Sequence, residues 1–375
     1  EQRCICEYPT GQQVTIPIVT IKGDEPERET FLITANIHGD EVTGVIVAHR
    51  IIEWLSNLES SQMKGTVVII PSLNPSGLMN GSRYPAFDPQ DPNRTFPDSK
   101  ISTDEKVPEI LEKDAWYNIH KSVADRKKPQ DKASEIVWKI IVDEIKPSFH
   151  LDLHTFSSLS IPFIFLDRLL FDETKHTKEE SQELWTKTND FVHAIGLSVI
   201  LEHPIHYYIK HKLHRSTSGA TLNNLGIPSC TIELGPMNCV PPNVRESGIK
   251  AVKNALIYSG FLQNFEFFEI TEVPVFKFDV PHRYLVYPQA NETGIVDILV
   301  PCGEQYTEGQ TLAIIRDISG IEKDKIIATN SGYVMGWFNG ITVFKDQPLG
   351  IVAVKDEDAP VVFSWQELLK DSFIL

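Results

Sequence analysis

The stretch Phe31-Leu-Ile-Thr-Ala-Asn-Ile-His38-Gly-Asp-Glu41 decides the fold class. Its first seven residues are mostly apolar or β-branched, which is typical of a strand buried on both faces of a parallel sheet. Directly after the polar tetrad 38–41, the apolar residues of 42–55 recur at helical spacing. A buried strand, a turn and a helix in this order indicate an α/β fold.

The alternation of strands and helices continues along most of the chain. We expect strands at 65–70, 149–155, 162–167 and 228–234, a helix over 133–145, and another from an N-cap at Asn243 to about residue 258. These elements fit a sheet with helices on both faces. The charged stretch 98–131 has no clean period, and we expect a surface insertion there.

From about residue 276 the pattern changes to short β-rich stretches separated by Gly, Pro and Asn. They lie at 283–287, 294–300, 310–315, 325–328, 332–337 and 349–354. A chain of 375 residues also exceeds the size at which one hydrophobic core usually stops growing. We therefore predict a larger α/β domain of residues 1–270 and a smaller β-rich domain of residues 271–375.

Composition and charge argue against several classes of protein. Hydrophobic residues make up 41% of the chain and charged residues 23%, which is average for a globular protein. A net charge of −16 argues against a nucleic-acid partner, and an anionic substrate would need a locally basic pocket. The chain has no apolar run of roughly 20 residues and no secretory signal, so we expect a cytoplasmic protein without a membrane partner.

Polar side chains at the strand ends suggest a metal site. His38 and Glu41 follow the first buried strand, at the edge of an α/β sheet where ligands gather. Imidazole and carboxylate are standard zinc ligands, and a catalytic zinc usually takes three protein ligands. A later strand carries His150, Asp152 and His154 on one face, and a third ligand can come from there. A hydrogen-bonded polar core is the alternative interpretation.

Two further stretches add an acid–base group and cations. Glu233 stands near the end of strand 228–234, and a carboxylate beside activated water can take its proton and later return it to a leaving amine. The long loop 74–97 carries Arg83 and Arg94, whose planar guanidinium groups suit a bidentate grip on a carboxylate. An ordinary strand end and a solvated loop are the alternative interpretations.

The chain resembles the succinylglutamate desuccinylase and aspartoacylase family, relatives of the zinc carboxypeptidases, in four ordered motifs: His38-Gly-Asp-Glu41, Asp91-Pro-Asn93-Arg94-Thr-Phe-Pro97, Asp152-Leu-His154 and Gly226-Ile-Pro-Ser-Cys-Thr-Ile-Glu233-Leu-Gly235. The resemblance implies that residues 1–270 form a carboxypeptidase-like catalytic domain, a mixed sheet flanked by helices. The β-rich tail is similar to a biotinyl- or lipoyl-type module. It lacks a Met-Lys-Met attachment turn, so we interpret it as a cap over the site.

The resemblance also implies a role for each residue of the motifs. One Zn²⁺ per chain would bind His38, Glu41 and His154, with Glu233 as general base and then acid. Arg83 would polarise the scissile carbonyl, with Arg94 as the alternative for this role. Asn93 and Arg94 would hold the free carboxylate of the substrate.

The predicted function is zinc-dependent hydrolysis of the amide bond of a small N-acyl amino acid or related N-acyl amine with a carboxylate. One alternative is a zinc carboxypeptidase that acts on peptides, and another is a catalytically silent binding protein of the same fold. The sequence leaves open whether the chain forms a homo-oligomer. It also leaves open whether the four histidines of 203–214 form a second metal site.

Overall fold

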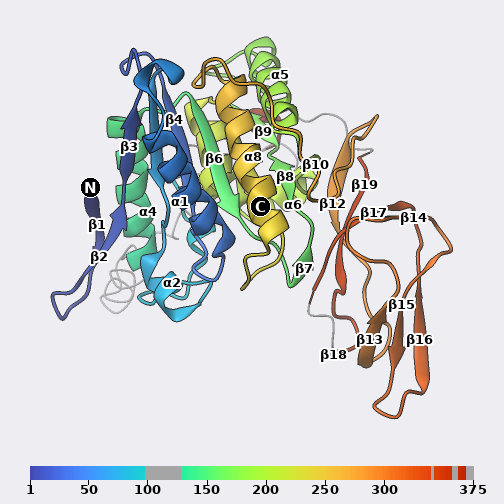
Figure 1. Cartoon of the computed structure of the whole chain (residues 1–375). Coiled ribbons are helices and arrows are strands. Elements are labelled where there is room, and N and C mark those ends of the chain that lie inside the picture. Colours follow the sequence, from blue (N-terminus) through green and yellow to red (C-terminus); the bar gives the residue numbers. More distant parts are fainter. Residues whose placement is uncertain (98–127, 339–341, 357–361, 369–375) are drawn as a thin grey trace, which may run out of the picture.

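A large mixed sheet forms the centre of the structure (Figure 1). The computed structural model describes residues 1–97, 128–338, 342–356 and 362–368. Helices pack against the sheet, which confirms the predicted α/β class. In the order in which they lie side by side, its strands are β14 (Gln305–Tyr306), β17 (Gly332–Trp337), β19 (Gly350–Lys355), β12 (His282–Val286), β10 (Ser198–Leu201), β8 (Phe163–Leu166), β11 (Ser229–Glu233), β6 (Phe149–His154), β4 (Thr30–Ala35), β5 (Thr66–Ile70) and β3 (Val19–Lys22), with β7 (Leu159–Ser160) paired to β17.

Smaller sheets and the helices surround this centre. A second sheet consists of β16 (Glu322–Ile327), β15 (Thr311–Arg316), β13 (Gly294–Ile298) and β18 (Thr342–Val343), and two pairs are formed by β1 (Gln2–Glu7) with β2 (Gln13–Pro17) and by β9 (Leu169–Phe171) with β20 (Val362–Ser364). The described α-helices are α1 (Thr43–Ser56), α2 (Pro75–Asn80), α4 (Pro129–Lys139), α5 (Lys178–Ala194), α6 (Ile205–Lys210), α7 (Thr217–Ala220), α8 (Pro242–Tyr258) and α9 (Trp365–Leu368). Short 3-10 or π turns occur at η1 (Ser60–Gln62), η2 (Pro92–Arg94), η3 (Ile140–Ile145), η4 (Leu213–Arg215) and η5 (Thr221–Leu225).

One face of the central sheet carries the main apolar core. Strand alternation places Ile33, Leu153 and Ile232 on this face, and all three are fully buried. Helices α1, α5 and α8 cover the face and contribute apolar side chains to the same cluster. The opposite face carries Thr34 and Asp152, which are register partners in β4 and β6. Polar chemistry is therefore concentrated on one side of these strands.

The C-terminal strands continue the central sheet. β12 lies parallel to β10, with Leu201 opposite Arg283, and β19 and β17 follow β12 (Figure 1). The six strands predicted beyond residue 276 are present as β12, β13, β15, β16, β17 and β19. The domain division at residue 270 remains a prediction, and the sheet crosses it.

A buried ion pair also joins the two parts of the chain. Asp356, just after β19, lies 2.9 Å from Arg168 Nη1 and 3.5 Å from Arg283 Nε. The side chains of Arg168 and Asp356 are almost fully buried. Because a buried guanidinium without a counter-charge is costly, this contact helps to hold β12 and β19 against the larger domain.

One local prediction was wrong, and another lies mostly outside the described residues. The predicted N-cap at Asn243 is wrong, because α8 begins at Pro242 and Pro241 occupies the cap position. Proline is favoured in the first helical turn, where its missing N–H costs nothing. Most of the expected insertion 98–131 is not described, and the chain enters α4 at its end.

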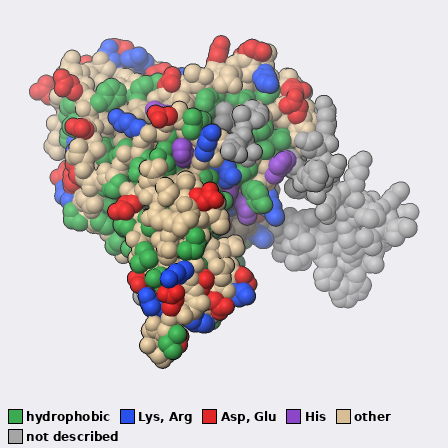
Figure 2. Space-filling model, turned by 90° about the vertical axis from the view of Figure 1, so that its right-hand side faces the viewer, with side chains coloured by type: hydrophobic (Ala, Val, Ile, Leu, Met, Phe, Trp, Pro, Cys, Tyr) green, Lys and Arg blue, Asp and Glu red, His purple; other side chains and the backbone are tan. Residues whose placement is uncertain are grey.

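The distribution of charge can be followed on one face of the molecule (Figure 2). On the face in Figure 2, the described acidic and basic side chains are interspersed rather than gathered into a basic stripe. Within the described ranges, no helix combines the length and the apolar composition needed to cross a bilayer.

We expect Asp356→Ala to lower the free energy of unfolding by about 3 kcal/mol or more, since it leaves buried Arg168 without its counter-charge. Denaturant unfolding followed by fluorescence measures this loss. Glu53→Ala is the matched control, because its ion pair with Arg50 is largely exposed and should contribute little. Equal, small losses in both variants would show that the Asp356 contact does not hold the sheet extension.

Candidate active site

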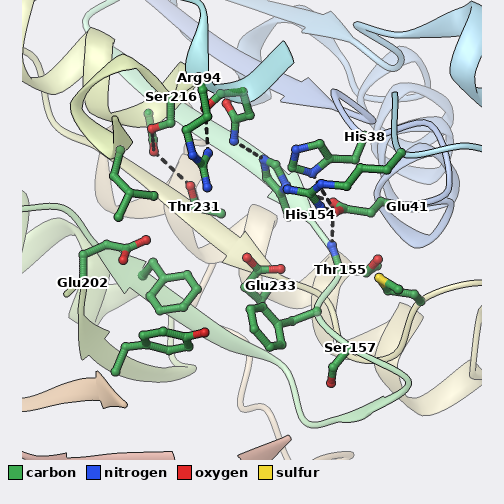
Figure 3. Close-up of a pocket in the computed structure, with 18 of the residues that line it drawn as sticks. His38, Glu41, Arg94, His154, Thr155, Ser157, Glu202, Ser216, Thr231 and Glu233 are labelled. Carbon is green, nitrogen blue, oxygen red and sulfur yellow. Dashed lines mark hydrogen bonds and ion pairs between the residues drawn. The ribbon is translucent and has the colours of Figure 1, made fainter. Parts of the chain in front are cut away.

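His38, Glu41 and His154 meet on the polar side of the sheet (Figure 3). Glu41 Oε1 lies 2.7 Å from His38 Nδ1, and Glu41 Oε2 lies 2.9 Å from His154 Nδ1. All three side chains are buried, and their potential ligand atoms lie within 4.8 Å of one another. This group could bind a metal ion.

The turn after β4 explains how His38 and Glu41 reach the same point. Asn36 has a positive φ of 56°, and its side-chain amide donates to the backbone oxygens of His38, Gly39 and Glu41. A Cβ at Gly39 would lie 2.1 Å from the backbone carbon of Gly77, so no larger residue fits there. The turn is thus fixed by its own hydrogen bonds and by close backbone packing.

Each imidazole of the group has a carboxylate at its other nitrogen. Asp152 Oδ2 lies 2.8 Å from His154 Nε2, and Asp91 Oδ1 lies 3.1 Å from His38 Nε2. Thr34 Oγ1 donates to Asp152 at 2.6 Å. Carboxylates in this position orient metal-ligating imidazoles and raise their basicity. Asp91 and Asp152 belong to the sequence motifs, but we had predicted no role for them.

Opposing effects set the protonation of the group. Burial raises the pKa of Glu41, but the two imidazoles outweigh it and hold that pKa well below its usual range. Burial lowers the pKa of His154, but Asp152 and Glu41 outweigh it and raise that pKa well above normal. A divalent cation at this point would displace the proton from His154, because a ligating imidazole must be neutral.

Glu233 lies at the end of β11, directly opposite His154 in the strand register. It is 6% exposed, and its Oε2 has no hydrogen-bond partner among the described residues. Burial raises its pKa to about 8. Figure 3 shows the carboxylate pointing into the pocket beside the metal-binding group. An unpaired buried carboxylate at this place is suited to take up and release a proton.

The two predicted arginines lie in different parts of the pocket wall. Arg83 lies beside the metal-binding group, with Nη2 2.9 Å from Asp91 Oδ2 and Nη1 3.4 Å from Glu41 Oε1. Arg94 is the last residue of η2 and lines the pocket, and its Nη1 donates to the backbone oxygen of Asn93 at 2.6 Å. Arg94 makes no ion pair with any residue that the structure describes.

Asn93 is held from the other side of the pocket. Its Oδ1 accepts hydrogen bonds from Thr217 N at 2.8 Å and from Thr217 Oγ1 at 2.9 Å. Its Nδ2 lies 3.5 Å from His154 Nε2. The amide oxygen is therefore engaged, and only the amide nitrogen remains for a substrate. The roles assigned to Asn93, Arg83 and Arg94 stay predictions.

These residues surround a cavity of about 300 Å³. Sequence reasoning missed several of its wall residues: Phe165, Glu202, Thr231, Tyr284 and Phe338. Tyr284 and Phe338 come from the C-terminal region, and each ring centroid lies 6.0 Å from that of Phe156. Thr231 could have been predicted, because alternation along a strand places it on the same face as Glu233.

The histidines of 203–214 do not form a second metal group. In the part of the chain that the structure describes, His38, Glu41 and His154 are the one set of three such ligands close enough to share an ion. The ring centroids of His203 and His211 lie 5.6 Å apart, whereas His214 is buried against Tyr208 and Trp365.

The sequence model of the succinylglutamate desuccinylase/aspartoacylase catalytic domain matches residues 27–259. The chain belongs to this family. Its members are deacylating hydrolases. The match ends after α8, so the β-rich C-terminal region lies beyond it.

Individual relatives are more distant. The chain is 22% identical to the N-alpha-acetyl-L-2,4-diaminobutyric acid deacetylase of Halomonas elongata over 326 residues, which cover 84% of this chain and 80% of the relative. A solved succinylglutamate desuccinylase/aspartoacylase of Rhodobacter sphaeroides aligns with a TM-score of 0.68 at 17% identity, over 95% and 94% of the two chains. The product-bound ectoine utilization protein EutE (DoeB) of Ruegeria pomeroyi aligns with a TM-score of 0.66 at 17% identity, over 94% of each chain. These structures show that the fold is shared.

His150 supports the site from within the sheet. It is fully buried, with Nε2 2.8 Å from Thr34 Oγ1 and Nδ1 2.9 Å from Thr221 Oγ1. Burial lowers its pKa to about 4, so the ring is neutral at pH 7. Because Thr34 also donates to Asp152, this chain of contacts reaches the carboxylate behind His154.

We expect His150 to make the fold acid-sensitive. Its folded pKa of about 4 lies below the unfolded value of 6.5, so its contribution to stability is full above pH 6.5 and is lost as the pH falls toward 4. Over that window the wild type should lose up to about 1.4 kcal/mol per pH unit more than His150→Gln, which has no group to titrate. Urea unfolding of both proteins from pH 7 to 4.5 measures the difference, and parallel pH profiles would contradict it.

Proposed function

We propose that this protein is a zinc-dependent deacylase that hydrolyses the amide bond of a small N-acyl amino acid, or of a related N-acyl amine with a carboxylate. The observation that carries the proposal is the position of Glu233. Its unpaired, buried carboxylate faces a group of two imidazoles and one carboxylate inside a small cavity. This arrangement supports a catalytic zinc site with three protein ligands and a neighbouring acid–base group.

The donor set fits zinc. His38, Glu41 and His154 would hold the ion, and Asp91 and Asp152 would orient the two imidazoles. A zinc ion there supplies Lewis-acid chemistry, which polarises a carbonyl and makes water more acidic.

The surrounding side chains can transfer the proton, stabilise the developing charge and bind the substrate. Glu233 would take the proton of the attacking water and pass it to the nitrogen of the leaving amine. Arg83 would stabilise negative charge on the carbonyl oxygen, because its guanidinium lies next to Glu41. Arg94, which has no described acidic partner, would hold the carboxylate of the substrate together with the amide nitrogen of Asn93.

The cavity favours a small substrate over a peptide. Tyr284 and Phe338 from the C-terminal region form part of its wall, and a volume of about 300 Å³ is at the lower end for ligand sites. A carboxypeptidase needs a groove open to a long chain. A silent binding protein has no need for the unpaired Glu233 carboxylate, whose burial is costly.

The proposal leaves the side chain of the released amino acid open. The family name refers to succinylglutamate and to an acylated aspartate. The amino acid released from either of these compounds has a second carboxylate. The relative from Halomonas elongata is named for an acylated 2,4-diaminobutyric acid, which has a second amine.

Metal binding tests the donor set. We expect about one zinc per chain in the wild type, none in His154→Ala, and an affinity about 10- to 100-fold weaker in Asp152→Asn. Elemental analysis and competition with a chromophoric chelator measure both quantities. His49→Ala, an exposed histidine of α1, is the control and should keep full zinc. Normal zinc content in His154→Ala would contradict the proposed site.

Catalysis tests Glu233. Glu233→Gln keeps the shape of the side chain but cannot accept the proton, so turnover should fall by about 10²- to 10⁴-fold while zinc content is unchanged. The assay is release of free amine from a panel of N-acyl amino acids and short peptides, with Glu53→Gln as an exposed control. A fully active Glu233→Gln would remove Glu233 from the mechanism, and faster cleavage of peptides would favour the carboxypeptidase alternative.

A further inference from the structure

We propose that the amino acid released by this site has a protonated amine in its side chain, and that Glu202 binds this amine. The inference rests on the proposed deacylase function and narrows its substrates to N-acyl diamino acids. It assigns Glu202 as a specificity residue, distinct from the metal ligands and from Glu233.

Glu202 lies at the far end of the cavity from the metal-binding group. It follows β10, and its backbone N–H donates to the oxygen of Leu166 at the end of β8. The residue is 9% exposed and lines the cavity. Figure 3 shows its carboxylate pointing into the pocket, with Glu233 between it and His154. A substrate whose amide lies at Glu233 can therefore extend its other end toward Glu202.

The carboxylate of Glu202 has no cationic partner in the described structure. Its Oε2 accepts one hydrogen bond, from the backbone N–H of His203 at 3.2 Å. The guanidinium of Arg168 donates to the backbone oxygens of Glu202 and His203 and pairs with Asp356. Arg94 donates to a backbone oxygen as well. Neither arginine forms an ion pair with the Glu202 carboxylate, although both lie close enough to lower its pKa.

The neighbouring side chains compensate the charge of Glu202 only in part. Burial lowers the pKa of His203 to about 4, so its ring is neutral at pH 7. Burial raises the pKa of Glu202 itself to about 7. An isolated buried carboxylate is costly, whereas a bound ammonium would pair with it and restore the charged form. A second carboxylate on the substrate would instead be repelled.

The wall beside Glu202 is aromatic. The ring of Tyr284 lies 4.5 Å from that of His203 and 5.4 Å from that of Phe165, measured between centroids. Aromatic faces attract ammonium groups. Asp167 is another buried acid of this region, but it accepts from Tyr208 Oη at 2.8 Å and does not line the cavity. Among the described residues, Glu202 is therefore the acid of the cavity wall besides Glu41 and Glu233.

Three N-acetyl amino acids that differ in side-chain charge test the inference on the zinc-loaded full chain: N-α-acetyl-L-2,4-diaminobutyrate with a cationic side chain, N-acetyl-L-norvaline with a neutral one of the same size, and N-acetyl-L-glutamate with an anionic one. We expect kcat/KM for the cationic compound to exceed that for each of the others by at least about tenfold. Glu202→Gln should lower the ratio between the cationic and the neutral compound by at least about tenfold. Because both rates come from one variant, partial misfolding cancels in the ratio.

Glu266→Gln is the matched control, since it makes the same charge change on an exposed loop and should keep the wild-type ratio. Calorimetric titration of the three compounds into zinc-loaded Glu233→Gln, with and without Glu202→Gln, measures binding without turnover. Cation-selective binding that Glu202→Gln removes supports the inference even if no compound is hydrolysed, and only the deacylase function then fails. Hydrolysis without cation preference, selectivity that survives in Glu202→Gln, or absence of selective binding would each overturn the inference.

Discussion

The carboxylate of Glu41, held between the imidazoles of His38 and His154, is the contact on which the site depends. Three buried polar groups can meet in this way only if the surrounding fold compensates each of them. Asp91 and Asp152 stand behind the imidazoles, and a backbone N–H supports Glu41. The parallel pairing of β4 and β6 brings the two halves of the group together.

This constraint explains why the sheet has two unlike faces. The face under α1, α5 and α8 is apolar and supplies most of the burial that stabilises the domain. The other face carries the polar residues of β4, β6 and β11, and the C-terminal strands cover one end of it with Tyr284 and Phe338. The extension of the sheet past β10 therefore contributes to the wall of the cavity.

The sequence predicted the meeting of His38, Glu41 and His154, because polar residues after parallel buried strands must lie at the same edge of a sheet. Glu202 was not predictable in this way. β8 runs antiparallel to β11, so β10 points in the opposite direction and its following residue reaches the cavity across the sheet face. The local sequence pattern predicted the C-terminal strands. It could not predict the pairing of Leu201 with Arg283, because these residues lie far apart in the chain. The potential metal ligands could thus be recognised from motifs at the ends of strands, whereas the part of the cavity around Glu202 depends on the pairing of distant segments.

X-ray absorption at the zinc edge, on the chain loaded with one equivalent of zinc, tests the central claim most directly. The account predicts a first shell of nitrogen and oxygen atoms at about 2.0–2.2 Å that includes two imidazoles, and the loss of one imidazole in His154→Ala. Sulfur neighbours at about 2.3 Å would show that cysteines bind the metal instead. A spectrum that is unchanged in His154→Ala would equally contradict the account.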